Sequence, residues 1–128
     1  REEMKMVWET KKILGDENVL VNPTAVRVPV FFGHGESLHI ETSSQISAEE
    51  VKSLLTQAEG VVVCANDEDF PTQISDASGN DDTYVGRIRE DLSHPNGINM
   101  WIVADNVRKG AATNSIQIAE LLIKEYLS

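Results

Sequence analysis

Arg27 and His34 are the two side chains of this 128-residue sequence whose types and spacing first suggest chemistry. They stand seven residues apart in a run rich in β-branched and aromatic residues, and His34 lies between two glycines. A guanidinium offers a planar fork for a carboxylate, and an imidazole ordinarily titrates near neutral pH. Together they suit the anchoring of an acidic substrate and the transfer of a proton. A surface Arg and a His in a turn are the simpler alternative.

Two further groups of charged residues precede or follow this pair. Glu2 and Lys5 lie three positions apart in a helical pattern, so one helix face is expected to carry both. They suit a shared ligand or a solvated ion pair. Arg108, Lys109 and Gly110 precede a later helical pattern whose N-terminus suits an anion or an amide. A basic turn over a sheet edge is the structural alternative.

The remaining reactive side chains favour structural roles. Cys64 ends an apolar run and precedes acidic residues at 67–69, whose charges disfavour a thiolate. His39 and Glu41 share one face of an expected strand and offer half a metal site. Because no third or fourth ligand is in view, a surface pair across strands is the better interpretation, and no metal is expected. Gly33 and Gly35 form a G-x-G without the third glycine or the βαβ unit of a dinucleotide fold.

Composition limits the possible partners and compartment. The chain has 21 Asp and Glu against 11 Lys and Arg, a formal net charge of −10. This excess argues against nucleic acid or an anionic membrane as a partner. A single Cys excludes an internal disulfide, and no apolar run approaches the roughly 20 residues of a membrane span. We expect a cytoplasmic protein, and a chain that is one piece of a longer one.

The hydrophobic pattern predicts an α+β domain, with a sheet that carries helices on one face. A capping box at 47–50 starts the second helix. The last helix carries an apolar stripe that includes Ile116, Leu122 and Tyr126. The expected helices are 2–14, the segment after 47 and the C-terminal segment. The expected strands are 26–32, 37–42, 61–64, 83–89 and 99–104, with Pro29 at a sheet edge or a bulge. A long surface loop is expected at 65–82 and a hairpin turn at 94–97.

Several of these stretches, in the same order, resemble the C-terminal part of bacterial aspartate-semialdehyde dehydrogenase. The matching segments are residues 1–5 (REEMK), 9–14 (ETKKIL), 22–24 (NPT), 27–30 (RVPV) with 33–34 (GH), 85–91 (VGRIRED) and 104–112 (ADNVRKGAA). The resemblance implies part of a glyceraldehyde-3-phosphate-dehydrogenase-like C-terminal catalytic and dimerisation domain with a mixed sheet, in a homodimer or homotetramer. It also implies that the N-terminal nucleotide-binding domain and the nucleophilic Cys lie outside residues 1–128, and that Cys64 is not that nucleophile.

The family interconverts L-aspartyl-4-phosphate and L-aspartate 4-semialdehyde with NADP, through a thioacyl intermediate, on the route to lysine, diaminopimelate, methionine and threonine. By resemblance, His34 is the general acid/base and Arg27 binds the substrate carboxylate. Glu2 faces the substrate amino group, Lys5 helps to hold the phosphate, and Asn114 lies near the nicotinamide amide. The fragment by itself is expected to be inactive. A stand-alone α+β binding or dimerisation module without catalysis is the alternative.

Overall fold

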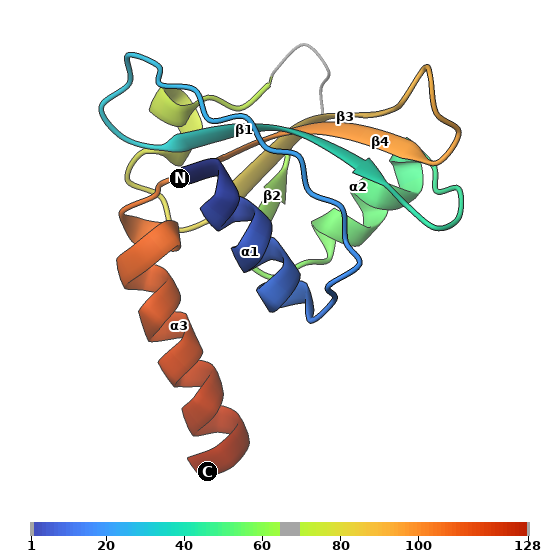
Figure 1. Ribbon diagram of the computed structural model, residues 1–128. Helices are drawn as coiled ribbons and strands as arrows, with labels where there is room; N and C mark the ends of the chain where they lie inside the picture. The colour runs from blue at the N-terminus through green and yellow to red at the C-terminus, as the bar shows by residue number, and fades with distance from the viewer. Residues whose placement is uncertain (1, 65–69, 128) are drawn as a thin grey trace.

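A mixed sheet of four strands forms the centre of the chain in a computed structural model that describes residues 2–64 and 70–127 (Figure 1). The order in the sheet is β1-β4-β3-β2. β1 pairs antiparallel with β4, and β4 with β3, whereas β2 runs parallel to β3. The strand bounds are His34–Glu41 (β1), Val61–Val63 (β2), Thr83–Glu90 (β3) and Gly97–Ala104 (β4). The expected mixed sheet is therefore present.

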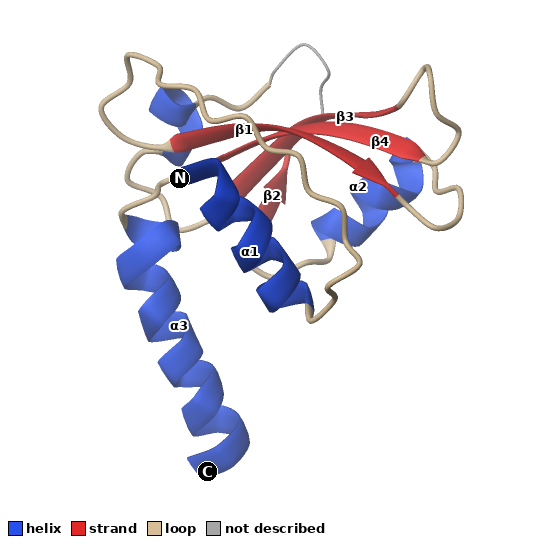
Figure 2. Cartoon of the chain, viewed as in Figure 1, coloured by secondary structure: helices blue, strands red, loops and turns tan. Residues whose placement is uncertain are grey.

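The α-helices of the described residues, three in number, lie on one side of this sheet in the view of Figure 2, as the α+β prediction requires. They are α1 (Glu2–Leu14), α2 (Ala48–Thr56) and α3 (Thr113–Leu122). Three π-helical turns accompany them: η1 (Gln73–Ala77), η2 (Arg108–Ala112), which leads into α3, and η3 (Ile123–Leu127), which follows it.

The predicted capping box begins α2. The Ser47 side chain accepts the Glu50 amide, and the Glu50 carboxylate accepts the Ser47 amide in return. The next free amide, that of Ala48, donates to the Glu90 carboxylate at the end of β3, over 2.7 Å. The N-terminus of α2 is thus tied to the sheet that it covers.

The two faces of β4 pack against different elements. Ile98 and Met100 point to one face and form the main core with Ala48 of α2. Val103 alternates to the opposite face and is fully buried, and there the indole N–H of Trp101 donates to the Pro71 carbonyl at 2.8 Å. η1 begins two residues after Pro71, so this turn covers the second face at one end of the sheet.

The hairpin of β3 and β4 ends in the predicted turn at 94–97. The Asp91 amide donates to the Gly97 carbonyl at 2.8 Å, and the Asp91 carboxylate lies 2.6 Å from Nε2 of His39 on β1. Hydrogen bonds from the Ser93 hydroxyl and amide, and then from His39, lower the pKa of Asp91 to about 2. His39 of β1 therefore pairs with a side chain just beyond the end of β3, as the surface-pair interpretation expected.

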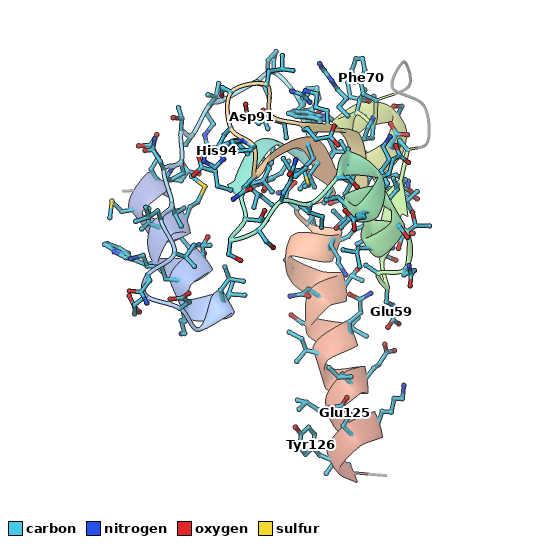
Figure 3. The ribbon with its side chains drawn as sticks, turned by 90° about the vertical axis from the view of Figure 1, so that its right-hand side faces the viewer. Glu59, Phe70, Asp91, His94, Glu125 and Tyr126 are labelled. Carbon is cyan, nitrogen blue, oxygen red and sulfur yellow. The ribbon has the colours of Figure 1, made fainter. Side chains whose placement is uncertain are left out.

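Helices α1 and α3 bury none of their residues against the rest of the described chain. Their apolar side chains are largely exposed, among them Trp8 of α1 and Ile116 of α3. Figure 3 shows α1 and α3 standing apart, with Glu125 and Tyr126 near the free end of the C-terminal helix. No described helix is long and apolar enough to cross a membrane.

The expected strand over residues 26–32 is wrong. That segment is irregular, and the Val30 amide donates to the Val28 carbonyl at 2.9 Å, a local turn around Pro29. The order of elements therefore has one strand fewer than predicted, and the first strand begins at His34 rather than Ser37. The expected loop at 65–82 contains η1; its first five residues, 65–69, lie outside the described residues.

Arg87 is the one described non-glycine residue with a positive φ, +54°, at the point where the β3–β4 register shifts. Its guanidinium lies 5.8 Å from the centre of the Phe70 ring. Asn tolerates this backbone conformation and a β-branched residue does not. We expect Arg87→Val to lower the free energy of unfolding by about 1–2 kcal/mol relative to Arg87→Asn. Both variants lose the Phe70 contact, so equal stabilities in urea unfolding would contradict a strained backbone here.

Candidate functional site

Glu2 and Arg27 form a direct ion pair, although they come from α1 and from the irregular segment that precedes β1. The Arg27 Nη2 atom donates to both Glu2 carboxylate oxygens, at 2.9 and 2.8 Å. The neighbouring Glu3 carboxylate accepts the Ala25 amide at 2.9 Å and holds this segment beside the start of α1. Both partners of the pair are exposed, with 84% of the Arg27 side chain open to solvent.

Lys5 lies on the next turn of α1 and makes an i,i+4 ion pair with Glu9 at 3.5 Å. The expected Glu2–Lys5 contact is replaced by two pairs, Glu2 with Arg27 and Lys5 with Glu9. Exposed pairs of this kind contribute about 0–1 kcal/mol, so a ligand can replace them at little cost. The first two turns of α1 thus present one ammonium and one carboxylate–guanidinium pair at the surface.

His34 is the first residue of β1, where it lies opposite Ala104, the last residue of β4. Its side chain is exposed. Thr113, next to Asn114, donates to Asp81, which lies two residues before the start of β3 at Thr83. Because Thr83 also pairs with Ala104, the expected acid/base residue and the expected nicotinamide contact are near the same end of the sheet. Asn114 is the second residue of α3 and is exposed.

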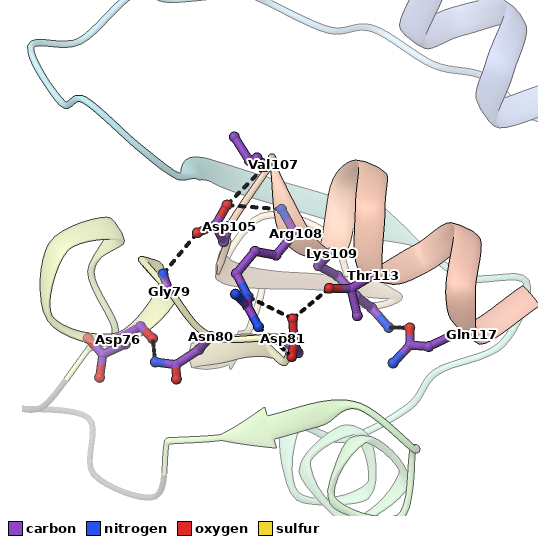
Figure 4. A network of polar contacts seen from close by, with 10 residues as sticks. All are labelled: Asp76, Gly79, Asn80, Asp81, Asp105, Val107, Arg108, Lys109, Thr113 and Gln117. Atoms are coloured by element: carbon purple, nitrogen blue, oxygen red, sulfur yellow. Dashed lines mark hydrogen bonds and ion pairs between the residues drawn. The ribbon is translucent and has the colours of Figure 1, made fainter.

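A carboxylate–guanidinium pair fixes the start of α3 (Figure 4). Asp81 accepts two hydrogen bonds from Arg108, at 2.8 and 2.9 Å, and one from the Thr113 hydroxyl at 2.6 Å. Lys109 donates to Gln117 one turn further along. The Arg108 and Lys109 charges are therefore engaged within the described chain, which favours the structural interpretation of this basic turn over an anion site.

Asp105 satisfies the free amides at the beginning of η2. It is 5% exposed, and its carboxylate accepts the amides of Val107 at 2.9 Å, Arg108 at 3.1 Å and Gly79 at 2.9 Å. These bonds hold the pKa of Asp105 below its usual range, that from Gly79 contributing most. The segment between β4 and α3 is thereby fixed to the chain that follows η1 (Figure 4).

The Asp81 contacts lead to a pH prediction. Hydrogen bonds from Arg108 and then Thr113 lower the pKa of Asp81 from 3.8 to about 2. A depressed carboxyl pKa stabilises the fold above the unfolded pKa, and this contribution is lost as the pH falls from about 4 towards 2. A ¹³C NMR titration of the Asp81 carboxyl should give a midpoint near 2 and, in Arg108→Leu, a midpoint closer to 3.8. A midpoint near 3.8 in the unchanged chain would contradict the pairing.

Cys64 occupies a packed position at the end of β2. Its amide donates to the Val85 carbonyl at 2.8 Å and so extends the parallel pairing with β3 by one residue. Its side chain is half-buried, near Gly86. In the part of the chain that the structure describes, no three His, Cys, Asp or Glu side chains gather as a metal site. The acidic residues 67–69 that weighed against a reactive Cys64 lie outside the described residues.

Comparison with known proteins identifies the family. Residues 1–109 match the family model described as semialdehyde dehydrogenase, dimerisation domain. The chain belongs to this family. Membership of the semialdehyde dehydrogenase dimerisation domain family agrees with the resemblance that its sequence motifs indicated.

Relatives named aspartate-semialdehyde dehydrogenase match nearly the whole chain. One from Shewanella sp. is 58% identical over 98% of this chain, and aspartate-semialdehyde dehydrogenase 2 from Vibrio cholerae is 59% identical over 98%. The chain spans only 37% of the length of each. The predicted family is thus confirmed.

Solved structures of the same family share the fold. The Vibrio cholerae aspartate semialdehyde dehydrogenase II, crystallised in a complex with ASA, superposes with a TM-score of 0.94 at 59% identity, over 98% of this chain and 37% of that one. The Francisella tularensis enzyme superposes with a TM-score of 0.85 at 29% identity, over 95% of this chain and 35% of that one. The α+β prediction for the dimerisation domain is therefore confirmed.

Sequence reasoning missed the acidic residues that hold the segments around the candidate site. Asp81 lay in a stretch interpreted only as loop, and its partner Arg108 is 27 positions away, so no local pattern joins them. Asp105 did offer a signal. An Asp just before a helical segment is typical of a residue that accepts free amides, as Asp105 does for Val107 and Arg108.

Proposed function

We propose that this chain is the substrate-binding and proton-transfer part of an aspartate-semialdehyde dehydrogenase. The reaction interconverts L-aspartyl-4-phosphate and NADPH with L-aspartate 4-semialdehyde, phosphate and NADP. The observation that carries the proposal is the exposed Glu2–Arg27 pair, in a chain 58% identical to a protein of that name. In this proposal a nucleotide-binding domain and the nucleophilic Cys lie outside residues 1–128.

The Glu2–Arg27 pair has the charges that an α-amino acid needs. An α-ammonium group suits the Glu2 carboxylate, and an α-carboxylate suits the Arg27 guanidinium, through charge-assisted hydrogen bonds. A zwitterion can therefore enter between the two side chains and replace their direct contact of 2.8 Å. Because the pair is exposed, breaking it costs about 1 kcal/mol at most.

Lys5 supplies the charge for the third group of the substrate. It lies one turn from Glu2 on α1, and an ammonium is a compact positive charge that suits phosphate. Its partner Glu9 is exposed, so phosphate can compete for the ammonium. The carboxylate, guanidinium and ammonium together match the three charged groups of an aminoacyl phosphate.

His34 is the proposed general acid/base. It is exposed at the start of β1, and a neutral imidazole accepts a proton from a thiol or a hemithioacetal hydroxyl and returns it in the reverse direction. The cofactor would supply the hydride as NADPH or accept it as NADP when bound. The Asn114 side chain offers one donor group and one acceptor, which fit a carboxamide such as that of nicotinamide.

We also propose that the parent protein is a homodimer or homotetramer that works in the cytoplasm, in the formation of lysine, diaminopimelate, methionine and threonine. The family description as a dimerisation domain supports assembly. The edges of the sheet, β1 and β2, each have one unpaired side in the described chain. Light scattering should give a dimer or tetramer mass for an enzyme that contains this chain, and a monomer would contradict the proposed assembly.

The catalytic proposal is tested by exchange of this chain into a relative. A chimaera of the Vibrio cholerae enzyme, with this chain in place of the matching 37%, should reduce NADP in the presence of aspartate semialdehyde and phosphate. The unmodified enzyme is the matched control. A folded chimaera that reduces no NADP would contradict the proposal.

A further inference from the structure

Both neighbours of His34 are glycines, so the backbone around it depends on contacts with other elements of the fold. Gly33 has a φ of +91°, a conformation that side-chain-bearing residues rarely adopt. A glycine on each side gives the histidine no local side-chain packing to fix its direction. A residue that transfers a proton has to be placed within hydrogen-bond reach of the reacting atom.

Asn106 supplies the polar contact at this point. Its Oδ1 atom accepts the Gly33 amide at 3.0 Å, and the two residues are 73 positions apart in the chain. Asn106 is half-buried and follows Asp105, which accepts three backbone amides and is almost fully buried. The acceptor for the Gly33 amide is therefore carried on a fixed segment.

Gln73 of η1 and Trp101 of β4 close the space around the glycines. A Cβ added to Gly35 would lie 2.5 Å from Gln73 Nε2 and 2.7 Å from the Trp101 ring. A Cβ added to Gly33 would lie 3.0 Å from Gln73 Cβ. The backbone on both sides of His34 thus rests against side chains from two other elements. One of these side chains, that of Trp101, is itself hydrogen-bonded to the Pro71 carbonyl.

We propose that Asn106 is a positioning residue for His34. Its acceptor oxygen fixes the Gly33 amide, and with Gln73 and Trp101 against the glycines it sets the direction in which the His34 imidazole leaves β1. This inference rests on the proposed acid/base role of His34. It assigns to Asn106 an effect on proton transfer and not on substrate binding, since its contact is with the backbone next to the imidazole.

Three variants in the Vibrio cholerae chimaera test the role. Asn106→Ala removes the acceptor and should lower kcat by about 10-fold or more, with KM for aspartate semialdehyde within about twofold, because small displacements of a reacting group reduce the rate strongly. Asn106→Asp keeps an acceptor oxygen and should restore kcat to within about threefold. Its added charge should move the His-dependent limb of the kcat–pH profile to higher pH. Asn80→Ala, which removes an exposed amide donor to the Asp76 carbonyl, is the matched control and should leave kcat unchanged.

A double variant separates this inference from the proposed function. In a His34→Asn background, Asn106→Ala should have no further effect on kcat. If His34→Asn alone retains activity, the acid/base role fails. If His34→Asn loses activity but Asn106→Ala does not, the positioning role alone is overturned. An equal loss from Asn106→Ala with and without His34, or a loss that Asn106→Asp does not restore, would also overturn it.

Discussion

Replacement of His34 by Asn in an assembled enzyme is expected to lower kcat by about 10²–10⁴-fold, the contribution typical of a positioned general acid/base. Asn keeps a polar side chain of similar size but cannot take up the proton. His34 is exposed at the first position of β1, so the substitution should leave the fold intact. Steady-state kinetics should show the loss in kcat, with little change in KM.

His94→Asn is the matched control for this variant. His94 lies in the turn before β4, and its Nδ1 accepts the Asn96 amide at 3.2 Å. The eight residues of β4 separate this turn from the end that pairs with His34, roughly 24 Å at the rise of an antiparallel strand. The control should keep wild-type kcat. Wild-type turnover in His34→Asn would show that the acid/base assignment is wrong.

Arg27→Leu is expected to act mainly on substrate binding. Leu cannot donate to a carboxylate, and a hydrogen bond to a charged group contributes about 1.5–3 kcal/mol. KM for aspartate semialdehyde should therefore rise by about 10–100-fold, with a much smaller change in kcat. Because the Glu2–Arg27 pair is exposed, thermal stability should change little.

Arg27→Lys and Glu2→Gln refine this test. Lys keeps the charge but loses the planar fork, so its KM should lie between those of the wild type and Arg27→Leu. Glu2→Gln removes the charge opposite the α-ammonium and should also raise KM. Unchanged KM in Arg27→Leu would remove Arg27 from the proposed substrate site.

Elements with a strong local signal are predictable from this sequence. The capping box at Ser47 and Glu50 specified the start of α2. Two runs that favour extension, one on each side of the turn at 94–97, specified the β3–β4 hairpin. The prediction of a strand over residues 26–32 was wrong. Its β-branched residues favour extension, but Pro29 removes an amide donor that a strand would need. The apolar stripe of α3 was recognised, but composition does not say whether a stripe is covered, and here it is exposed.

The candidate site shows the same division. Spacing placed Glu2 and Lys5 on one helix face. Lys5 pairs with Glu9 one turn along the same helix, whereas the Glu2 partner, Arg27, depends on where the chain returns after α1. Asn106 was noted only as part of a basic segment, since its contact with Gly33 spans 73 positions. The functional roles came from resemblance of motifs to a family, which the comparisons confirm as the family of this chain.

The most direct test of the proposed division of the active site uses two separate polypeptides. One is this chain and the other is the remaining part of the Vibrio cholerae enzyme, and the assay is phosphate-dependent NADPH formation from aspartate semialdehyde. We expect no activity from this chain alone, activity from the copurified mixture, and little from a mixture made with His34→Asn. Activity from residues 1–128 alone, or none from a copurified complex of the two parts, would contradict the proposal that this chain supplies binding and proton transfer but not the nucleophile.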